Sequence, residues 1–401
     1  MSSRHALIPA RPVDDHRRRI EDALRPLSGR AVETVPMDRA LGRLLAADVD
    51  APLDLPVFRN SAMDGYAVRA DTVAIVPATL PLIGVVAAGN TEQLTLPPGA
   101  AVKVMTGAPV PPGADCVVPV EHTESDGVTV TVRTSRATGD FVREPGTDVR
   151  AGALLASAGT LLRPRHIAAL AAVGLGELPV RRRVRAAVLT TGDELRPAGT
   201  DLLPGQIYNS NGIALAAALA DNGVEVVSVA HSTDEHAEFR ARLAEAVAHA
   251  DVVFTSGGVS MGDFEVVKEV LAAQGGEFGP VAMQPGGPQG LSVVDGVPVL
   301  SFPGNPVSTM VSFEVFARPL LRELAGLPAL PISQLPLLDS VRSPAGKRQF
   351  LRGKLAADGV TLVSGQGSHL IAAMAHAEVL VDIPAAATEV PAGTVVEVRP
   401  L

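Results

Sequence analysis

Residues 251–265 read Asp-Val-Val-Phe-Thr-Ser-Gly-Gly-Val-Ser-Met-Gly-Asp-Phe-Glu, and they predict a strand, a glycine turn and the start of a helix. The apolar run at 252–254 suits a buried strand and is too short for a helix. Gly257 and Gly258 allow the backbone to turn sharply and to approach a ligand. A helical pattern follows from Val266, so backbone N–H groups meet a positive helix end, which favours a bound oxyanion such as phosphate. A plain structural turn is the alternative interpretation of a Gly-Gly pair.

Two carboxylates in the same turn affect what such a site could hold. Asp263 and Glu265 follow the glycines closely, and bare carboxylates repel a bound anion. A divalent cation between them would resolve this conflict, and Mg²⁺ favours carboxylates combined with phosphate. The stretch therefore predicts a site that holds an anion together with Mg²⁺.

The pattern around this stretch predicts the fold class. From Arg181 onward, apolar runs of strand length alternate with helical patterns as far as about residue 324. This alternation calls for a parallel sheet with helices on both faces. Ligands bind beyond the carboxyl ends of the strands in such sheets. Those ends carry turns rich in Gly, Ser, Thr and acids at 191–194, 231–234, 256–258 and 303–306.

The remainder of the chain is predicted to be richer in β structure. A helix is expected at 14–27 and another at 164–173, and short β-prone runs separated by Gly and Pro fill 80–144. After residue 331 the alternation stops, and a small β domain is expected. The predicted domains are a split N-terminal domain at 1–50 and 145–180, an inserted β-rich domain at 51–144, an α/β domain at 181–330 and a C-terminal β domain at 331–401.

Length and composition exclude several classes of protein. A chain of 401 residues with 47% hydrophobic and 19% charged residues is expected to fold into two to four domains. Its apolar runs are too short to span a membrane and its N-terminus lacks a signal-peptide core, so a cytoplasmic location is expected. A net charge of −9 and the absence of Trp argue against a nucleic-acid partner. The single cysteine, Cys116, excludes an internal disulfide and is expected to be buried.

Several longer motifs recur together in one known family. They are Ser-Ala-Met-Asp-Gly-Tyr-Ala at 61–67, the segment 105–115, Thr-Gly-Asp-Glu-Leu at 191–195, Ser-Gly-Gly-Val-Ser-Met-Gly at 256–262, Pro-Gly-Asn-Pro-Val-Ser at 303–308 and Phe-Leu-Arg-Gly at 350–353. In this order, and over nearly the whole chain, they resemble the molybdopterin molybdenumtransferase family, called MoeA in bacteria and related to the E domain of gephyrin.

The resemblance implies both an architecture and an activity. The architecture is a homodimer of four-domain subunits: a split N-terminal domain with an inserted β module, a three-layer α/β domain and a small C-terminal β barrel. The activity is the insertion of molybdate into adenylylated molybdopterin, with Mg²⁺-dependent release of AMP, during synthesis of the molybdenum cofactor. The implied partners are a molybdopterin adenylyltransferase and apo-molybdoenzymes.

The residue pattern and the resemblance together assign roles to individual positions of this chain. The catalytic residues would be Asp64, Asp148, Glu194, Asp234 and Glu265. The metal ligands would be Asp234, Asp263 and Glu265. The residues that bind the molybdopterin substrate would be Thr106, Gly192, Ser256, Gly257, Gly258, Ser260, Pro303, Gly304, Asn305, Pro306 and Ser368.

One departure from the family pattern concerns basic residues. Where the family usually has lysines, this chain has Pro280, Gln284 and Gly287. Charge-assisted contacts of about 1.5–3 kcal/mol each are lost with them, which should weaken anion binding by about tenfold or more. Candidate substitutes are Arg59, Lys103 and Arg348.

Two other functions compete with the transferase, which is the leading hypothesis. A catalytically weakened paralogue could act as a dimeric scaffold or cofactor-binding protein; the missing lysines favour it and the retained acids oppose it. An adenylyltransferase of the related MogA type would share the α/β domain. The segment 61–67 and the C-terminal β domain oppose that reading, because proteins of that type normally lack both.

Overall fold

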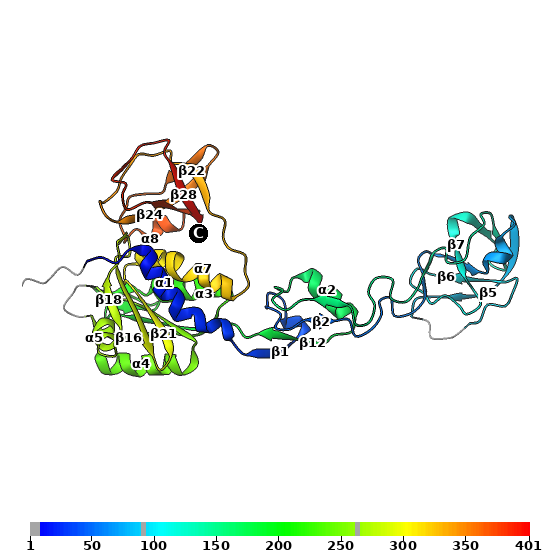
Figure 1. Ribbon diagram of the computed structural model, residues 1–401, viewed down its shortest axis with the longest axis horizontal. Helices are drawn as coiled ribbons and strands as arrows, with labels where there is room; N and C mark the ends of the chain where they lie inside the picture. The colour runs from blue at the N-terminus through cyan, green and yellow to red at the C-terminus, as the bar shows by residue number, and fades with distance from the viewer. Residues whose placement is uncertain (1–8, 90–93, 261–264) are drawn as a thin grey trace, which may run out of the picture. The chain divides into compact units, whose positions relative to one another are not determined.

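The computed structural model describes residues 9–89, 94–260 and 265–401, and the chain forms two compact units (Figure 1). Unit 1 takes in the chain up to residue 33, residues 42–44 and residues 181–401, whereas unit 2 comprises residues 34–41 and 45–180. The finer division into four domains, with the boundaries given above, remains a prediction. None of the helices in the described part of the chain combines the length and apolar character that a membrane crossing demands.

A six-stranded sheet forms the centre of unit 1, in the order β16-β13-β17-β21-β20-β18. The first four strands in this order run parallel, which confirms the parallel sheet expected from the βα alternation. The last two pair antiparallel, and the sequence pattern did not predict them. The strands are β13 (Arg185–Thr191), β16 (Glu225–Ser232), β17 (Val252–Ser256), β18 (Glu277–Pro280), β20 (Pro288–Val294) and β21 (Val297–Phe302).

The antiparallel edge has a local cause. Asp295 and Gly296 join β20 to β21, and both have positive φ, at 48° and 83°. Positive φ at both central positions is typical of a type I′ turn, whose twist matches that of two antiparallel strands. A two-residue turn reverses the chain at once, whereas a parallel return needs a crossover of a dozen or more residues.

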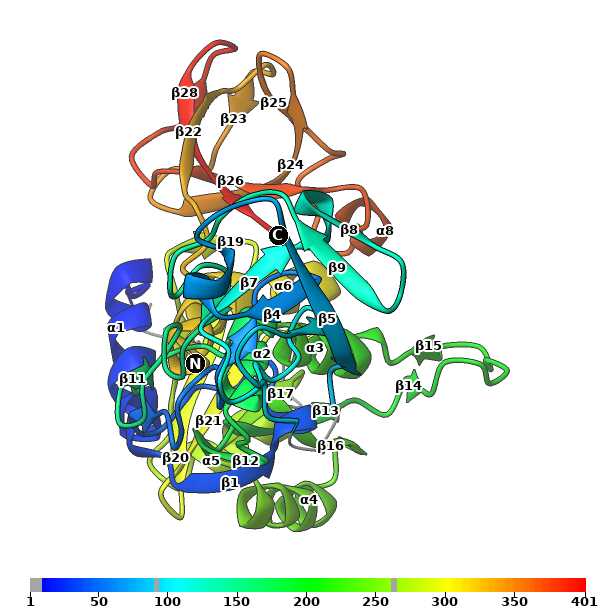
Figure 2. The ribbon, with the colours of Figure 1, turned by 90° about the vertical axis from the view of Figure 1, so that its right-hand side faces the viewer.

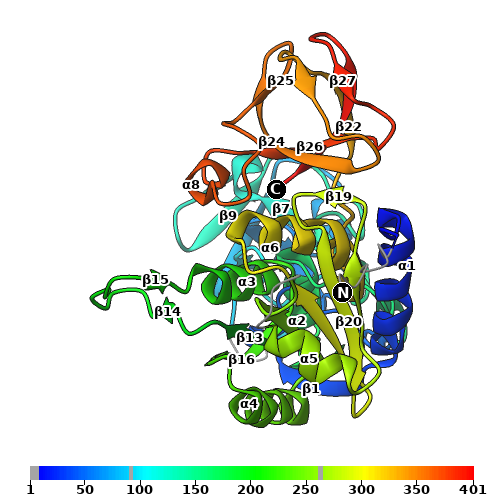
Figure 3. The same cartoon turned by 90° about the vertical axis from the view of Figure 1, so that its left-hand side faces the viewer.

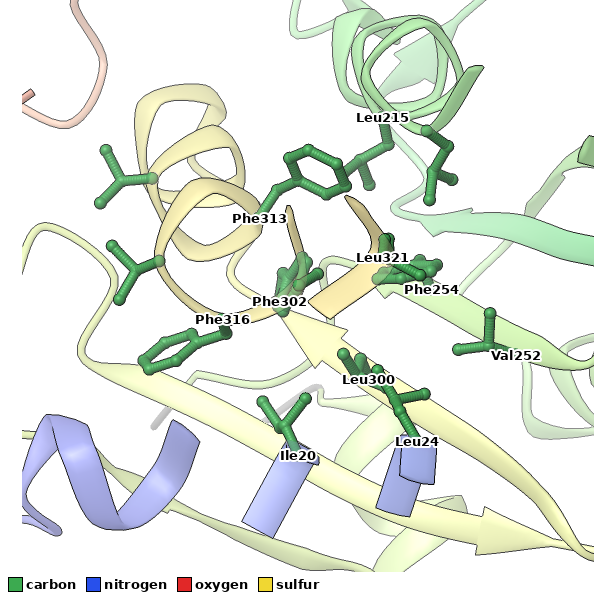
Figure 4. Packing of buried hydrophobic residues seen from close by; sticks show 14 of the residues in the cluster. Ile20, Leu24, Leu215, Val252, Phe254, Leu300, Phe302, Phe313, Phe316 and Leu321 are labelled. Carbon is green, nitrogen blue, oxygen red and sulfur yellow. The ribbon is translucent and has the colours of Figure 1, made fainter. Parts of the chain in front are cut away.

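Helices cover both faces of this sheet, as expected (Figure 3). Alternate strand residues face opposite sides: Val252 and Phe254 belong to one core, Val253 and Val299 to the other. Figure 4 shows the first core, which packs the sheet against α1, α3 and the helices after β21. The second lies under α4 and α5. The helices are α1 (Val13–Leu24), α3 (Ser210–Asp221), α4 (His236–His249), α5 (Val266–Ala272), α6 (Pro306–Ser312), the π-helical turn η5 (Phe313–Ala317) and α7 (Arg318–Leu324).

The C-terminal part of unit 1 is a second sheet, with the order β19-β24-β26-β28-β22 and β25 beside β24. Its own core includes Leu337, Val381 and Ile383, so the β structure expected after residue 331 is confirmed. A short two-stranded pair, β23 with β27, and the helix α8 (Ile371–Met374) complete it. The strands are β19 (Met283–Gln284), β22 (Ser333–Pro336), β23 (Val341–Arg342), β24 (Arg348–Ala356), β25 (Gly359–Leu362), β26 (Val379–Ile383), β27 (Glu389–Val390) and β28 (Val395–Pro400).

Unit 2 contains a third sheet of six strands, in the order β7-β4-β6-β5-β9-β8. Gly65 lies in β4, where a Cβ atom would collide with the carbonyl oxygen of Val118 in β7, so the strands can pair this closely only at glycine. The strands are β4 (Gly65–Val68), β5 (Ala78–Val86), β6 (Ala101–Val104), β7 (Cys116–Pro119), β8 (Thr123–Ser125) and β9 (Thr129–Val132).

The rest of unit 2 is a helix with short strand pairs. Leu162 and Leu170 anchor α2 (Pro164–Ala172) in a separate small core. In the sheet of unit 2, Cys116 is buried as expected, and its S–H donates to the carbonyl of Val68 at 3.7 Å. The other short strands between residues 32 and 181 are β1 (Val32–Pro36), β2 (Val49–Asp50), β3 (Asn60–Ser61), β10 (Val142–Arg143), β11 (Leu154–Ala156) and β12 (Glu177–Arg181).

Candidate active site

A cavity of about 450 Å³ lies at the carboxyl ends of β13, β17 and β21, at the edge of the sheet where the sequence predicted a ligand. The turns after these strands form its floor. Most residues assigned to the substrate or to catalysis in the α/β domain line it together. They are Gly192, Glu194, Asp234, Ser256, Gly257, Gly258, Ser260, Glu265, Pro303, Gly304, Asn305 and Pro306.

Two glycines of the floor, Gly257 and Gly258, could not be replaced by another residue without strain. Gly257 has a φ of 101°, and a Cβ atom there would lie 2.7 Å from the carbonyl oxygen of Thr191. Gly258 has a φ of 66°, and its Cβ would lie 2.7 Å from a methyl group of Val267. A Cβ on Gly304 would lie 3.4 Å from the Cα of Gly257, so the turns after β17 and β21 nearly touch. Close backbone approach of this kind leaves the cavity floor without side chains.

A hydrogen-bond network fixes these turns to α3. The hydroxyl of Ser256 accepts from Asn211 Nδ2 at 2.9 Å and lies 3.2 Å from the hydroxyl of Thr309. Asn211 Nδ2 also donates to the carbonyl of Gly304 at 2.7 Å, and Thr309 donates to the carbonyl of Pro303 at 2.6 Å. Two strand ends and two helices are thereby held in one arrangement.

The N-terminus of α3 faces the cavity, and sequence reasoning missed it. Asn209 caps the helix: its side-chain oxygen accepts from Gly212 N at 3.1 Å, and its amide donates to the Thr190 hydroxyl at 2.7 Å. Ser210 and Asn211 follow it and line the cavity. Their position in the first turn of a helix makes the wall suitable for a negatively charged group. The signal was readable, since Asn-Ser-Asn-Gly before a helical run is a typical helix start.

Three acids supply the charge of the cavity: Glu194, Asp234 and Glu265. Among the described residues that line it, none is Lys, Arg or His. Burial raises the pKa of Asp234, and the neighbouring carboxylates of Asp193 and Glu194 raise it further. The Glu265 carboxylate accepts from Ser260 N at 2.7 Å. The Glu194 carboxylate lies over Gly192, where a Cβ would approach one of its oxygens to 2.6 Å.

This donor set suits a hard divalent cation. Mg²⁺ is usually held by one or two carboxylates together with substrate phosphates, while backbone N–H groups nearby donate hydrogen bonds to the phosphate. Of the predicted ligands, Asp234 and Glu265 line the cavity, whereas Asp263 lies outside the described residues. Within the described ranges, no cluster of three or more His, Cys, Asp or Glu side chains is arranged to hold a metal by itself.

The remaining predicted residues do not line the cavity. Ser368 is nearby, because its carbonyl accepts at 3.2 Å from the N–H of Val307, which lies between the cavity-lining Pro306 and Ser308. In unit 2, the backbone N–H and hydroxyl of Thr106 donate to Asp64 Oδ1 at 2.6 and 2.8 Å, and these bonds hold the pKa of Asp64 below its usual value. The backbone N–H of Asp148, also in unit 2, donates to the carbonyl of Leu55 at 2.9 Å.

None of the suggested substitutes for the missing lysines lines the cavity. Arg348 makes a two-point contact with Asp382, at 2.7 Å for each bond. Arg59 donates to Glu144 at 2.7 Å, and Lys103 lies near Asp64, both in unit 2. Gly287 precedes Pro288, which does line the cavity, and a Cβ built there meets nothing closer than 3.7 Å.

A projecting arm (residues 195–208) completes one side of the cavity. Its base is the parallel pair β14 (Leu195–Arg196) and β15 (Ile207–Tyr208), and it extends away from the sheet in both Figure 2 and Figure 3. Ile207 N donates to the carbonyl of Glu194 at 2.9 Å. Leu195, Ile207 and Tyr208 line the cavity, and sequence reasoning did not assign them to the site.

Comparisons with known proteins cover nearly the whole chain. Residues 11–174 match the profile of the MoeA N-terminal region (domain I and II), residues 187–323 that of a probable molybdopterin binding domain, and residues 334–401 that of the MoeA C-terminal region (domain IV). The chain is 45% identical over 406 residues to molybdopterin molybdenumtransferase 2 of Mycobacterium tuberculosis, covering 97% of this chain and 99% of that relative.

Other relatives and a solved structure agree. Identity to the molybdopterin molybdenumtransferase of Synechococcus elongatus is 38% over 384 residues, covering 92% of this chain and 95% of the relative. A crystal structure of the molybdopterin biosynthesis MoeA protein from Pyrococcus horikoshii superposes with a TM-score of 0.78 at 32% identity, covering 98% of this chain and 99% of that one. The chain is therefore a transferase and belongs to the molybdopterin molybdenumtransferase family, MoeA.

Proposed function

We propose that the protein inserts molybdate into adenylylated molybdopterin and releases AMP in a Mg²⁺-dependent reaction, acting as a homodimer. One observation carries the proposal: a single cavity combines glycine turns and a helix N-terminus with the acids Glu194, Asp234 and Glu265. The first features suit phosphate oxygens and the second suit a divalent cation. A substrate with a pyrophosphate link between two larger groups needs both.

Each wall of the cavity then has a part in the reaction. The N–H groups of Gly258 and of the α3 N-terminus would bind the pyrophosphate and fix its orientation, whereas the N–H of Gly257 already donates to the carbonyl of Phe302 at 3.1 Å. Asp234 and Glu265 would hold Mg²⁺, with Asp263 as the third ligand expected from the sequence of the turn, and the ion would screen the phosphate charge from the carboxylates. Asp64, Thr106, Asp148 and Ser368 keep the roles that the resemblance assigns to them.

The test removes one carboxylate at the cavity. Asp234→Asn keeps the size of the side chain and removes its charge, so Mg²⁺-dependent AMP release should fall by about 100-fold or more, while the melting temperature changes little. AMP release from adenylylated molybdopterin, followed at increasing Mg²⁺, is the measurement. Glu235→Gln is the matched control, because Glu235 is the adjacent exposed acid and does not line the cavity.

The proposal fails if Asp234→Asn releases AMP at the wild-type rate and with the wild-type Mg²⁺ dependence. Reconstitution of an apo-molybdoenzyme, measured in the same tubes, separates release of AMP from delivery of molybdenum. A molybdopterin adenylyltransferase would supply the substrate, and apo-molybdoenzymes would accept the product.

One observation favours a second candidate, a weakened paralogue acting as a dimeric scaffold or cofactor-binding protein. The described cavity lining holds acids and no basic side chain that could bind molybdate. Gly287→Lys tests this, because Gly287 lies beside the cavity-lining Pro288 and has room for a side chain. For a working transferase, the added cation should lower the molybdate concentration for half-maximal AMP release by about tenfold.

The matched control is Gly29→Lys, which adds the same charge at an exposed glycine of unit 1 that also has open space around it. It should leave the molybdate dependence unchanged. If the wild type binds the substrate but keeps AMP attached at every molybdate concentration, the scaffold function is supported instead. If Gly287→Lys restores AMP release and Gly29→Lys does not, the missing basic side chain is the reason for the low activity.

A further inference from the structure

Tyr208 is the one aromatic side chain among the described residues that line the cavity. It belongs to β15, at the base of the arm, and 45% of it is exposed. Its hydroxyl donates to the carbonyl of Thr200, within the same arm, at 2.9 Å. This bond uses the polar end of the side chain and fixes the ring, so that a ring face remains available for contact.

An exposed aromatic ring is unusual in the described part of unit 1, although Phe58 and Phe141 of unit 2 are exposed. The chain has no Trp, 2 Tyr and 10 Phe among 401 residues. In the part of unit 1 that the structure describes, Tyr208 is the only Phe or Tyr that is exposed, whereas Phe254, Phe302, Phe313 and Phe316 are fully buried. An aromatic residue left at the surface, fixed by a hydrogen bond and lining a polar cavity, is typical of a ligand contact.

The neighbours of Tyr208 define what the ring could contact. The next residues, Asn209, Ser210 and Asn211, bring the α3 N-terminus to the same wall, where a phosphate would be bound. Ile207, which precedes Tyr208, adds an apolar residue to the cavity lining. An apolar aromatic face next to an anion seat suits a ligand that joins a flat heteroaromatic ring to a phosphate.

We infer that Tyr208 stacks on a planar heteroaromatic ring of the substrate and thereby positions it in the cavity. The identity of the substrate rests on the proposed function, and that substrate offers such rings in its adenine and its pterin. The shared chemistry is a flat, electron-rich ring attached to phosphate. Tyr208 is a specificity-determining residue in this inference and takes no part in bond breaking.

The test compares ligands with and without a ring. Stacking of a base on an aromatic side chain is lost when Tyr208→Leu replaces the ring by an apolar side chain, so affinity for AMP should fall by about tenfold. Ribose 5-phosphate lacks the base, and its affinity should not change. A merely structural role for Tyr208 would weaken both ligands equally. The affinities of both proteins for neopterin, measured in parallel, show whether Tyr208 stacks on the pterin ring instead of the adenine.

The composition of the chain gives a second, spectroscopic readout. In Tyr66→Phe, Tyr208 is the only remaining Tyr and there is no Trp, so tyrosine emission reports on Tyr208 alone. Saturating AMP should quench this emission, whereas ribose 5-phosphate should not. AMP also absorbs light, which lowers any tyrosine emission without stacking. Tyr208→Leu controls for this effect, because its one remaining Tyr, Tyr66, is buried in unit 2.

The outcomes separate this inference from the proposed function. Unchanged affinity of Tyr208→Leu for both AMP and neopterin overturns the stacking role, whatever the enzyme does. If AMP quenches the emission but the protein never releases AMP from adenylylated molybdopterin, the stacking role of Tyr208 is supported and the proposed reaction is rejected. A tenfold loss for neopterin alone assigns the seat to the pterin, and a loss for AMP alone assigns it to the adenine.

Discussion

Single glycines decide the shape of the cavity floor, and Gly257 has the strongest requirement. Its φ of 101° lies where L-residues are strained, and its Cα is enclosed by the Thr191 carbonyl and hydroxyl. The sequence could indicate this position, because a Gly-Gly pair after a buried strand predicts a sharp turn. It could not indicate Asn211, whose importance comes from contacts with Ser256 and Gly304, which are 45 and 93 residues away.

Gly257→Ala is expected to lower the free energy of unfolding by about 3 kcal/mol, from backbone strain and the clash with Thr191 together. Gly275→Ala is the control: Gly275 also has a positive φ, at 88°, but open space around its Cα. Gly275→Ala should lower the free energy of unfolding by about 1 kcal/mol, from backbone strain alone. Urea denaturation of both variants measures the difference. Equal losses would mean that the close approach to Thr191 has no energetic consequence.

Among the helices, α1 packs against the π-helical turn η5 through an unusual buried side chain. The ring of His16 packs edge-on against Phe316, with ring centres 4.8 Å apart, and its Nδ1 accepts from Arg11 at 3.2 Å. Burial, together with the charges of Arg11 and Arg19, lowers the pKa of His16 to about 3. The histidine is therefore neutral in the folded protein at every pH above that value.

The free energy of unfolding should therefore decrease as the pH is lowered. Below pH 6.5 the unfolded chain binds a proton at His16 that the folded chain does not, so acid favours unfolding. Between pH 7.5 and 5.5 this group alone should remove about 1.4 kcal/mol from the free energy of unfolding. In His16→Leu that part of the slope should be absent. His249→Leu, at an exposed histidine of α4, should keep the wild-type slope, and identical slopes in all three proteins would contradict the assignment.

Secondary-structure elements were the most predictable feature, for reasons visible in particular strands. Val252, Val253 and Phe254 are buried on alternate faces, so an uninterrupted apolar run was a reliable strand signal. The strands β18 and β20 were missed because glycine and proline interrupt them, as in Gly279 and Pro280. The Asp295-Gly296 pair was nevertheless a usable hairpin signal for the antiparallel edge.

For the whole molecule, the sequence could predict which turns meet at the edge of the α/β sheet, but it could not predict which charged side chains pair with one another. The turns after β13, β17 and β21 meet because parallel strands end on the same edge, which is a rule of topology and needs no contact information. Arg348 was suggested as an anion contact, yet it pairs with Asp382 on the neighbouring strand. Ion pairs between residues 34 positions apart leave no local pattern in a sequence.

The single thiol has a practical consequence for studying the arm. Burial and the nearby Asp115 raise the pKa of Cys116 to about 12, so almost no reactive thiolate forms at neutral pH. A cysteine introduced at the exposed tip of the arm, for example at Asp201, would then be the sole site for maleimide chemistry. The native sequence thus needs no cysteine removal before a fluorophore or spin label is attached, and movement of the arm during turnover can be followed in otherwise unaltered protein.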